Sequence, residues 1–253
     1  MVMVPEKPLD ETSSQRNHRQ HFKRSAAKWA LAAGVSGLIG LSAFYASNWR
    51  ALEHLPQLAR AHTAHERVKW TRLTQVSPWF PKALIATEDR SFYTNWGISF
   101  QGIARAALVD LQTGQFTQGG STITQELVRD LMLSSAKTIP RKVSGILLSL
   151  MTTALYSKQQ ILTMFINEVY LGDNAYGVGQ AAQSYFGITA KHLNLPESAL
   201  LAGLPQLPSV YDPLVNYKLA KLRQLQVLNG MVRDHMITHQ QAMRAYRAPL
   251  PLK

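Results

Sequence analysis

The sequence contains no cysteine among its 253 residues. Neither a disulfide framework nor a metal site with cysteine ligands is therefore available to the protein. Acidic side chains are also scarce, with 15 Asp and Glu against 27 Lys and Arg, and the formal net charge is +12. This excess favours an anionic partner, such as lipid headgroups, a pyrophosphate or nucleic acid, but charge alone does not choose among them.

A second absence marks the N-terminal region, because positions 29–49 carry no charged side chain. The stretch is rich in Ala, Gly, Leu, Val and Ile, and at about 1.5 Å per residue it is long enough to span a hydrocarbon core of roughly 30 Å. Basic residues precede it, which places the N-terminus in the cytoplasm. We expect an uncleaved single anchor rather than a cleaved signal peptide, since no clear Ala-x-Ala site follows the apolar run. A buried core helix is the other alternative.

Composition divides the chain into expected segments. These are a cytoplasmic basic tail (1–28, without regular structure up to residue 25), a transmembrane anchor (29–49), a connector (50–77), a catalytic domain (78–245) and a short tail (246–253). The connector contains His54, His62 and His65. We interpret it as a solvated, loosely helical linker rather than a metal site, because no carboxylate cluster or regular ligand spacing accompanies these histidines.

From Pro81 onward the sequence predicts helices, with no convincing alternating strand and no internal repeat. Helical spacing covers 81–89, 101–112, 123–133, 142–155, 157–169, 176–186, 196–204 and 218–236, with a short helix after Thr238. Ser121 or Thr122 is expected to cap the helix that begins at Ile123. A stripe in 218–236 predicts core packing, with partner binding as the alternative. It consists of Leu219, Leu222, Leu225, Leu228 and Val232. The predicted fold class is mainly α.

Three features between Glu88 and Lys142 suit a site that handles a sugar beside a phosphate. They are the acidic pair Glu88-Asp89, the Gly-Gly-Ser-Thr corner at 119–122 and the dibasic pair Arg141-Lys142. A carboxylate can remove a proton from a hydroxyl. Backbone N–H groups at a helix start, together with Lys and Arg, can hold a departing phosphate.

Residues from about 78 to 240 resemble the peptidoglycan glycosyltransferase module (family 51) of monofunctional biosynthetic transglycosylases and class A penicillin-binding proteins. Five blocks carry the resemblance: Glu88-Asp89-Arg90 with Phe92 and Gly97; Gly119 to Gln125; Arg141-Lys142; Lys158, Ile161-Leu162 and Asn167 to Gly172; and Tyr176-Gly177 to Gly187, followed by Leu200 to Pro205 and Tyr211-Asp212-Pro213. An anchor ahead of the domain, with no second domain after it, looks like the monofunctional form.

The resemblance implies a lysozyme-like, two-lobed α-helical domain on the periplasmic side of a bacterial inner membrane, behind one transmembrane helix. The implied reaction elongates glycan strands from lipid II, with Glu88 as general base on the acceptor hydroxyl. Arg141, Lys142 and Lys158 would hold the pyrophosphate leaving group. The other implied substrate-binding residues are Asp89, Arg90, Ser121, Thr122, Thr124, Gln125, Glu126 and Asn167.

The resemblance also sets expectations for partners. They are lipid II, the lipid-linked glycan strand, membrane lipids and other cell-wall synthesis proteins, and nucleic acid is not among them. No certain cofactor is implied, although a divalent cation, Mg²⁺ or Mn²⁺, stays open.

The sequence departs from the family pattern at four positions. Asn95 stands where the family has His, Glu126 replaces the second Gln of the second block, and Gly145 and Thr163 replace glutamates. Gly145 removes the family's second acid, which predicts reduced activity. For Glu126, a helix-surface acid is the favoured interpretation, and a carboxylate returned to the cleft is the alternative.

Three other functions stay open beside the polymerising enzyme. A catalytically impaired homologue would bind lipid II or act as a scaffold in cell-wall synthesis. A hydrolase of glycan strands is disfavoured by the dibasic pair, because a hydrolase meets no pyrophosphate. A nucleic-acid binder is disfavoured because no recognised motif appears and the anchor would place the domain on the wrong side of the membrane.

Overall fold

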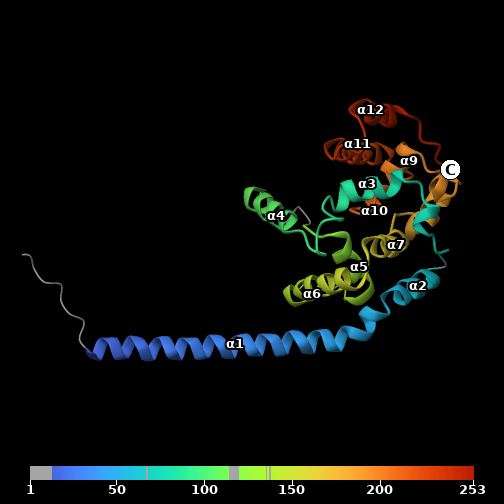
Figure 1. Ribbon diagram of the computed structural model, residues 1–253. Coiled ribbons are helices and arrows are strands. Elements are labelled where there is room, and N and C mark those ends of the chain that lie inside the picture. Colours follow the sequence, from blue (N-terminus) through green and yellow to red (C-terminus); the bar gives the residue numbers. More distant parts are fainter. Residues whose placement is uncertain (1–12, 67, 114–119, 135, 137) are drawn as a thin grey trace, which may run out of the picture. The chain divides into compact units, whose positions relative to one another are not determined.

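The computed structural model describes residues 13–66, 68–113, 120–134, 136 and 138–253, and this part of the chain is helical (Figure 1). The helices are α1 (Ser13–Glu53), α2 (Leu55–His65), α3 (Trp79–Glu88), α4 (Phe100–Thr113), α5 (Ile123–Met132), α6 (Ile139–Leu155), α7 (Lys158–Glu168), α8 (Gly177–Phe186), α9 (Leu195–Ala202), α10 (Pro208–Tyr211), α11 (Tyr217–Arg233) and α12 (His239–Arg247), with short 3₁₀ turns η1 (Leu73–Gln75) and η2 (Ala190–His192). Within the described residues the extended pairing is one bridge, between Tyr170 and Tyr176. The expected mainly α fold is confirmed.

Two compact units divide the chain, Met1–Trp49 and Arg50–Lys253. The first contains most of α1, whose portion Lys28–Glu53 has a mean hydropathy of 1.5 and is long and apolar enough to cross a membrane. This fits the expected N-terminal anchor by length and composition. The expectation of an irregular tail is wrong for residues 13–25, because α1 begins at Ser13; residues 1–12 lie outside the described residues.

Helix α2 belongs to the folded domain and corrects the interpretation of the connector as solvated. It packs against α5 and α7, and its Leu55 and Ala59 are fully buried. The hydroxyl of Tyr156, at the end of α6, donates to the carbonyl of Leu52 at 2.7 Å. Side chains from α2 therefore complete the domain core.

The helices of the domain pack in two groups. One contains α3, α9, α10, α11 and α12, and the other contains α2, α5, α6, α7 and α8. The chain passes from the first group to the second between Asp89 and Ile123. The two ends of this passage, the last turn of α3 and the first turn of α5, carry the candidate catalytic residues.

The start of α5 is held by a capping box at Thr122. Its Oγ1 accepts from the N–H of Gln125 at 3.1 Å, while Oε1 of Gln125 accepts from the N–H of Thr122 at 3.0 Å. The same hydroxyl donates to the carbonyl of Gly97 at 2.6 Å. Gly97 has φ +89° and approaches α6 so closely that a Cβ there would lie 2.3 Å from the carbonyl oxygen of Ser149. Only glycine fits this turn.

Helix α11 follows its predicted leucine stripe only in part, since Leu228 is fully buried and Val232 packs against the core. Leu222 is 45% exposed, whereas Ala220, Gln224, Val227 and Met231 are buried. The prediction of core packing along the leucine stripe is therefore wrong at Leu222. The rotation of α11 about its axis that buries these residues also turns Arg223 toward the candidate site.

Asn167, near the end of α7, holds the segment before η1 against the domain. Its Oδ1 accepts from the N–H of Thr71 at 2.7 Å, and its Nδ2 donates to the carbonyls of Thr71 and Thr163 at 2.9 and 2.7 Å. The side chain is 1% exposed. All of these bonds are internal to the protein.

Replacing Asn167 with Ala should therefore destabilise the protein. Loss of these bonds costs roughly 1–3 kcal/mol, which corresponds to a fall in Tm of several degrees for a domain of this size. Thermal unfolding of the full chain in detergent measures it. Gln159→Ala, at an exposed position of the same helix, is the control and should leave Tm unchanged. An unchanged Tm in Asn167→Ala would show that the side chain is free for another role.

Candidate active site

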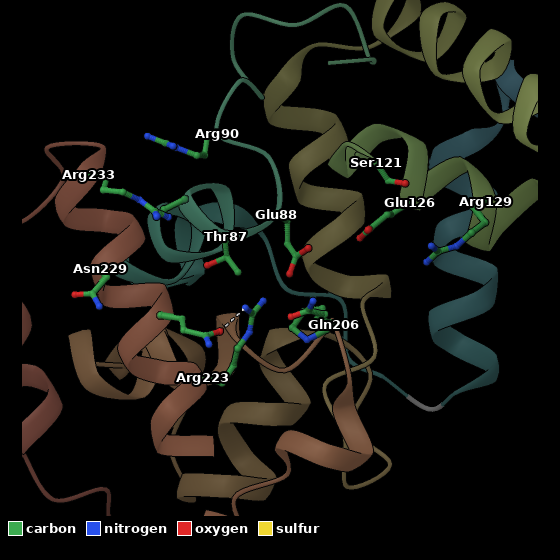
Figure 2. A pocket seen from close by; sticks show the side chains of 13 residues that line it. Thr87, Glu88, Arg90, Ser121, Glu126, Arg129, Gln206, Arg223, Asn229 and Arg233 are labelled. Atoms are coloured by element: carbon green, nitrogen blue, oxygen red, sulfur yellow. Dashed lines mark hydrogen bonds between the residues drawn. The ribbon is translucent and has the colours of Figure 1, made fainter. Parts of the chain in front are cut away.

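A cavity of about 850 Å³ opens between α3, α5 and α11 (Figure 2). It is lined by Ala86, Thr87, Glu88, Arg90, Ser121, Glu126, Arg129, Pro205, Gln206, Arg223, Gln226, Asn229 and Arg233. Of the predicted site residues it brings together Glu88, Arg90, Ser121 and Glu126. The lining is rich in charged side chains of both signs, which suits a polar, anionic substrate.

Glu88 is the last residue of α3 and points into this cavity. Its Oε1 is buried and has no hydrogen-bond partner among the described residues. Burial raises the pKa of Glu88 to about 7, opposed by the guanidinium groups of Arg223 and Arg129 and aided by Asp89. A free carboxyl group that titrates near neutral pH is suited to accept a proton from a substrate.

Glu126 lies in the first turn of α5 and reaches the same cavity from the other side (Figure 2). Burial and, to a lesser extent, the nearby Glu88 carboxylate raise the pKa of Glu126 to about 8, with Arg129 opposing the rise. The favoured interpretation of Glu126 as a helix-surface acid is therefore wrong. The helical period of a sequence shows which residues share a face of a helix, but not which neighbouring helix that face meets. The sequence of α5 therefore could not show that Glu126 faces α3, a helix of the other group.

The cationic part of the lining is arginine. Arg129 follows Glu126 by one helical turn and also pairs with Asp130 at 2.8 Å. From α11, the Nε of Arg223 donates to the carbonyl of Gly203 at 3.1 Å, which holds the guanidinium against the cavity. Arg90 pairs with Asp234. The sequence analysis did not predict Arg129 and Arg223 as site residues. The only signal available for either was that Arg129 follows Glu126 by three residues, which places both side chains on the same face of a helix.

A second cavity of about 620 Å³ adjoins the first and shares Glu126, Arg129 and Pro205 with it. Arg141 lines this cavity, and its Nε is buried without a hydrogen-bond partner among the described residues. Glu126 thus stands where the two cavities meet.

The second cavity also contains a carboxylate that sequence reasoning did not single out. Nδ1 of His62, on α2, lies 2.6 Å from Oε2 of Glu168 at the end of α7. Burial raises the pKa of Glu168 to about 7, opposed by His62. The contact with Glu168 accounts for the position of the His62 side chain without a metal ion.

Comparison with known proteins assigns the family. A family model described as Transglycosylase matches residues 56–232, which is more than half of the chain. This chain belongs to the transglycosylase family. The match begins within α2, which agrees with the packing of that helix against the domain.

The transglycosylase relatives include penicillin-binding protein 1A of Neisseria gonorrhoeae, 42% identical over 185 residues that make up 73% of this chain and 23% of that protein. Penicillin-binding protein 1A of Escherichia coli (strain K12) is 46% identical over 169 residues, 67% of this chain and 20% of that protein. The chain thus spans less than a quarter of the length of these relatives. The crystal structure of penicillin-binding protein 1A from Haemophilus influenzae covers 73% of this chain and 18% of that chain, with 24% identity and a TM-score of 0.46.

Asp89, in the first transglycosylase block, is buried and bonded within the protein. Nδ2 of Asn95 donates to both of its oxygens at 2.9 Å, the hydroxyl of Ser91 donates at 3.0 Å, and the N–H of Ile123 donates at 3.3 Å. Oδ1 of Asn95 accepts from the N–H of Gly97 and from Nζ of Lys158, both at 2.9 Å. The departure at Asn95 is thus accommodated, because an amide can donate on one side and accept on the other.

Several predicted substrate-binding residues have their polar atoms occupied inside this transglycosylase domain. They are Asp89, Thr122, Gln125, Lys158 and Asn167. Thr124 is fully buried, and its Oγ1 has no hydrogen-bond partner among the described residues. Lys142 is exposed and lines neither cavity. A substrate contact stays a prediction for all seven of these residues. The observed hydrogen bonds support structural roles for the five whose polar atoms bond within the domain.

Position 145, where the resemblance leads us to expect a second acid, lies inside α6. Gly145 is buried, and a Cβ there would meet Cδ1 of Leu133 at 3.5 Å. Leu133 itself lines the second cavity. An acid at position 145 would therefore have stood beside that cavity, whose lining in this chain includes the acids Glu126, Asp130 and Glu168.

Proposed function

We propose that the protein is a membrane-anchored peptidoglycan glycosyltransferase that polymerises lipid II into glycan strands. The observation that carries the proposal is the placement of Glu88, a buried carboxyl group with a free oxygen, in a cavity walled by arginines. Family membership supports the same reaction class. The activity, substrate and partners of the whole protein are parts of this proposal.

In the proposed reaction Glu88 removes the proton from the 4-hydroxyl of the acceptor sugar. The freed oxygen attacks the anomeric carbon of the lipid-linked strand, and the bond from that carbon to the pyrophosphate breaks. Negative charge then grows on the departing phosphate, which Arg129 and Arg223 at the first cavity, and Arg141 at the second, are placed to stabilise. Lys142 and Lys158 do not share this position, since one is exposed and the other is bonded to Asn95.

If a divalent cation takes part in the proposed reaction, it binds together with the pyrophosphate of the substrate. Mg²⁺ in proteins commonly bridges one or two carboxylates and substrate phosphates. The described residues offer no group of three or more His, Asp or Glu that could hold a metal by themselves. No step above depends on Mg²⁺ or Mn²⁺.

Two features of the structure support the proposed attachment to a membrane. One is the apolar portion of α1. The other is a set of exposed apolar residues on the domain, between Tyr93 and Leu108 and on α6: Tyr93, Trp96, Phe100, Ile103, Leu108, Ile139 and Val143. We propose that these residues dip into the bilayer surface, where lipid II resides, on the periplasmic side of the inner membrane, and that other cell-wall synthesis proteins meet the domain there.

A scaffold that binds lipid II without polymerising it is the second candidate, because Gly145 supplies no second acid. Reduced activity is the intermediate outcome. A lipid II polymerisation assay on the full chain in detergent separates the three possibilities.

Glu88→Gln should abolish polymerisation while lipid II binding persists. A positioned general base contributes about 10²–10⁴ in rate, so the residual signal should lie near background. Glycan strands are measured by gel and binding by quenching of labelled lipid II. Glu53→Gln, at an exposed position, is the matched control. Polymerisation by Glu88→Gln at the natural rate would contradict the assignment of the base, and an inert natural chain that binds lipid II would establish the scaffold.

A protein that begins at Arg50, and so retains α2, should still bind anionic liposomes without its anchor. Trp96 and Phe100 are 78% and 76% exposed, so replacing both with Ser should reduce the bound fraction several-fold by removing buried apolar area. High salt should weaken binding by screening the basic surface. Co-sedimentation measures both effects, with Val215→Ser as control, since Val215 is 77% exposed elsewhere. Equal loss in the control would refute a specific membrane face.

A further inference from the structure

Glu126 occupies a position that the reaction above does not use. It is in the first turn of α5, borders both cavities and faces the space that Glu88 enters from α3 (Figure 2). The two carboxyl groups come from different helix groups, so they meet only in the folded domain. Oε1 of Glu88 is buried and has no hydrogen-bond partner among the described residues, which leaves it directed at a ligand rather than at the protein.

The surroundings of Glu126 contain charges of both signs from every element that meets the cavities. The titratable and charged groups are Glu88, Asp89 and Arg90 at and after the end of α3, Arg129 and Asp130 on α5, Arg223 and Arg233 on α11, Arg141 on α6, His62 on α2 and Glu168 on α7. Of these, Arg129 is a direct counter-charge, but it is already paired with Asp130. Burial together with the nearby Glu88 therefore outweighs Arg129 and raises the pKa of Glu126 to about 8.

The two carboxyl groups consequently lose their protons in separate steps. Glu88 has the lower pKa, about 7, and Glu126 the higher, about 8. Between these values the pair holds one proton. We assign it to Glu126, because the guanidinium groups of both Arg223 and Arg129 favour the anion of Glu88, whereas of the two only Arg129 does so for Glu126. Glu88 is then the anion that a base must be, and Glu126 is a neutral acid whose O–H can donate.

We propose that Glu126 is the protonated partner of the catalytic base, and that it donates a hydrogen bond to an oxygen of the bound sugar-pyrophosphate while Glu88 accepts the proton of the acceptor. The inference rests on the proposed function and adds a second acid to it. A protonated carboxyl group and a carboxamide both offer one acceptor oxygen and at least one donor. This equivalence accounts for Glu at a position where the family pattern has Gln.

A protonated Glu126 that donates to the substrate should make the reaction rate depend on pH in a way that a structural role would not. When Glu126 ionises, it loses its donor and places a second negative charge beside the departing phosphate, so the rate should fall on the alkaline side. The natural chain should show a bell-shaped pH dependence of lipid II polymerisation. Glu126→Gln keeps a donor that cannot ionise and should retain the acidic limb but lose the alkaline one.

The decisive measurement is the polymerisation rate of the full chain in detergent from pH 6 to pH 9.5. At pH 9 the natural chain should retain about one tenth of its maximal rate, because one ionisation with the cited pKa controls it, whereas Glu126→Gln should retain most of its maximum. Glu126→Leu, which has no donor, should be slower by about tenfold or more at every pH. Glu53→Gln should keep the natural profile. An alkaline limb that persists in Glu126→Gln, or full activity in Glu126→Leu, would overturn the proposal.

A second measurement does not require activity. A carboxyl group whose pKa is raised by folding makes the folded state less stable as pH rises from its unfolded value, near 4.5, through its folded value, near 8. The Tm of Glu126→Gln, relative to that of the natural chain, should therefore rise between pH 5 and pH 9. A constant difference would show that Glu126 holds no such proton.

If the natural chain proves inert at every pH while this Tm trend appears, the proposed polymerase function fails and the protonated pair stands. If polymerisation is observed and the trend and the change of profile are both absent, the pair fails and the function stands.

Discussion

The domain depends on the buried carboxylate of Asp89, which joins its two groups of helices. Asp89 follows α3 directly and accepts hydrogen bonds from the turn at Ser91 and Asn95 and from the first N–H of α5, at Ile123. A carboxylate at a helix N-terminus also interacts favourably with the helix dipole. Since Asp89 is 4% exposed, its removal would leave several donors without partners. The acid next to the base is therefore structural.

This junction explains why the site forms where it does. Glu88 precedes Asp89 by one residue, and Glu126 follows Ile123 by nearly one helical turn, so the bond between Asp89 and Ile123 brings both glutamates to the same opening. Arg223 from α11 and Arg129 from α5 then face them across the cavity. Burying acids raises their pKa values, and the arginines limit that rise without cancelling it. Two neighbouring carboxyl groups with raised pKa values, the proposed base and acid, result from one structural contact.

The site also shows how a departure from a family pattern can be absorbed. Asn95 stands where the resemblance leads us to expect a histidine, and its amide supports Asp89, Gly97 and Lys158 together. Gly145 lies beside Leu133, which lines the second cavity, and Glu126 supplies a carboxyl group at the boundary between the two cavities. The chemistry proposed for Glu126 would supply the second acid that the resemblance leads us to expect at position 145.

The sequence by itself determined the helices and their caps, and it singled out Glu88 as the candidate base. Periodicity and capping residues predicted α3 to α9, and Thr122 caps α5 as one of two expected residues, because helix formation and capping depend on neighbours along the chain. Block order identified Glu88. Two predictions made from the polarity of the sequence were wrong. The expected irregular tail is helical from Ser13 onward, and the expected solvated connector buries Leu55 of α2 in the domain. A polar composition therefore does not by itself exclude a helix or the burial of one of its faces.

Only the tertiary structure decided which polar residues face the cleft. The sequence placed Asp89, Lys158 and Asn167 among the binding residues, and the fold occupies all three with internal bonds. It left Arg223 within a helix interpreted as core and Glu126 on a helix surface, and the fold turns both into one cavity. Position along a helix gives a direction relative to that helix alone. The direction relative to a substrate is set by how α3, α5 and α11 pack, which depends on contacts between residues far apart in the chain.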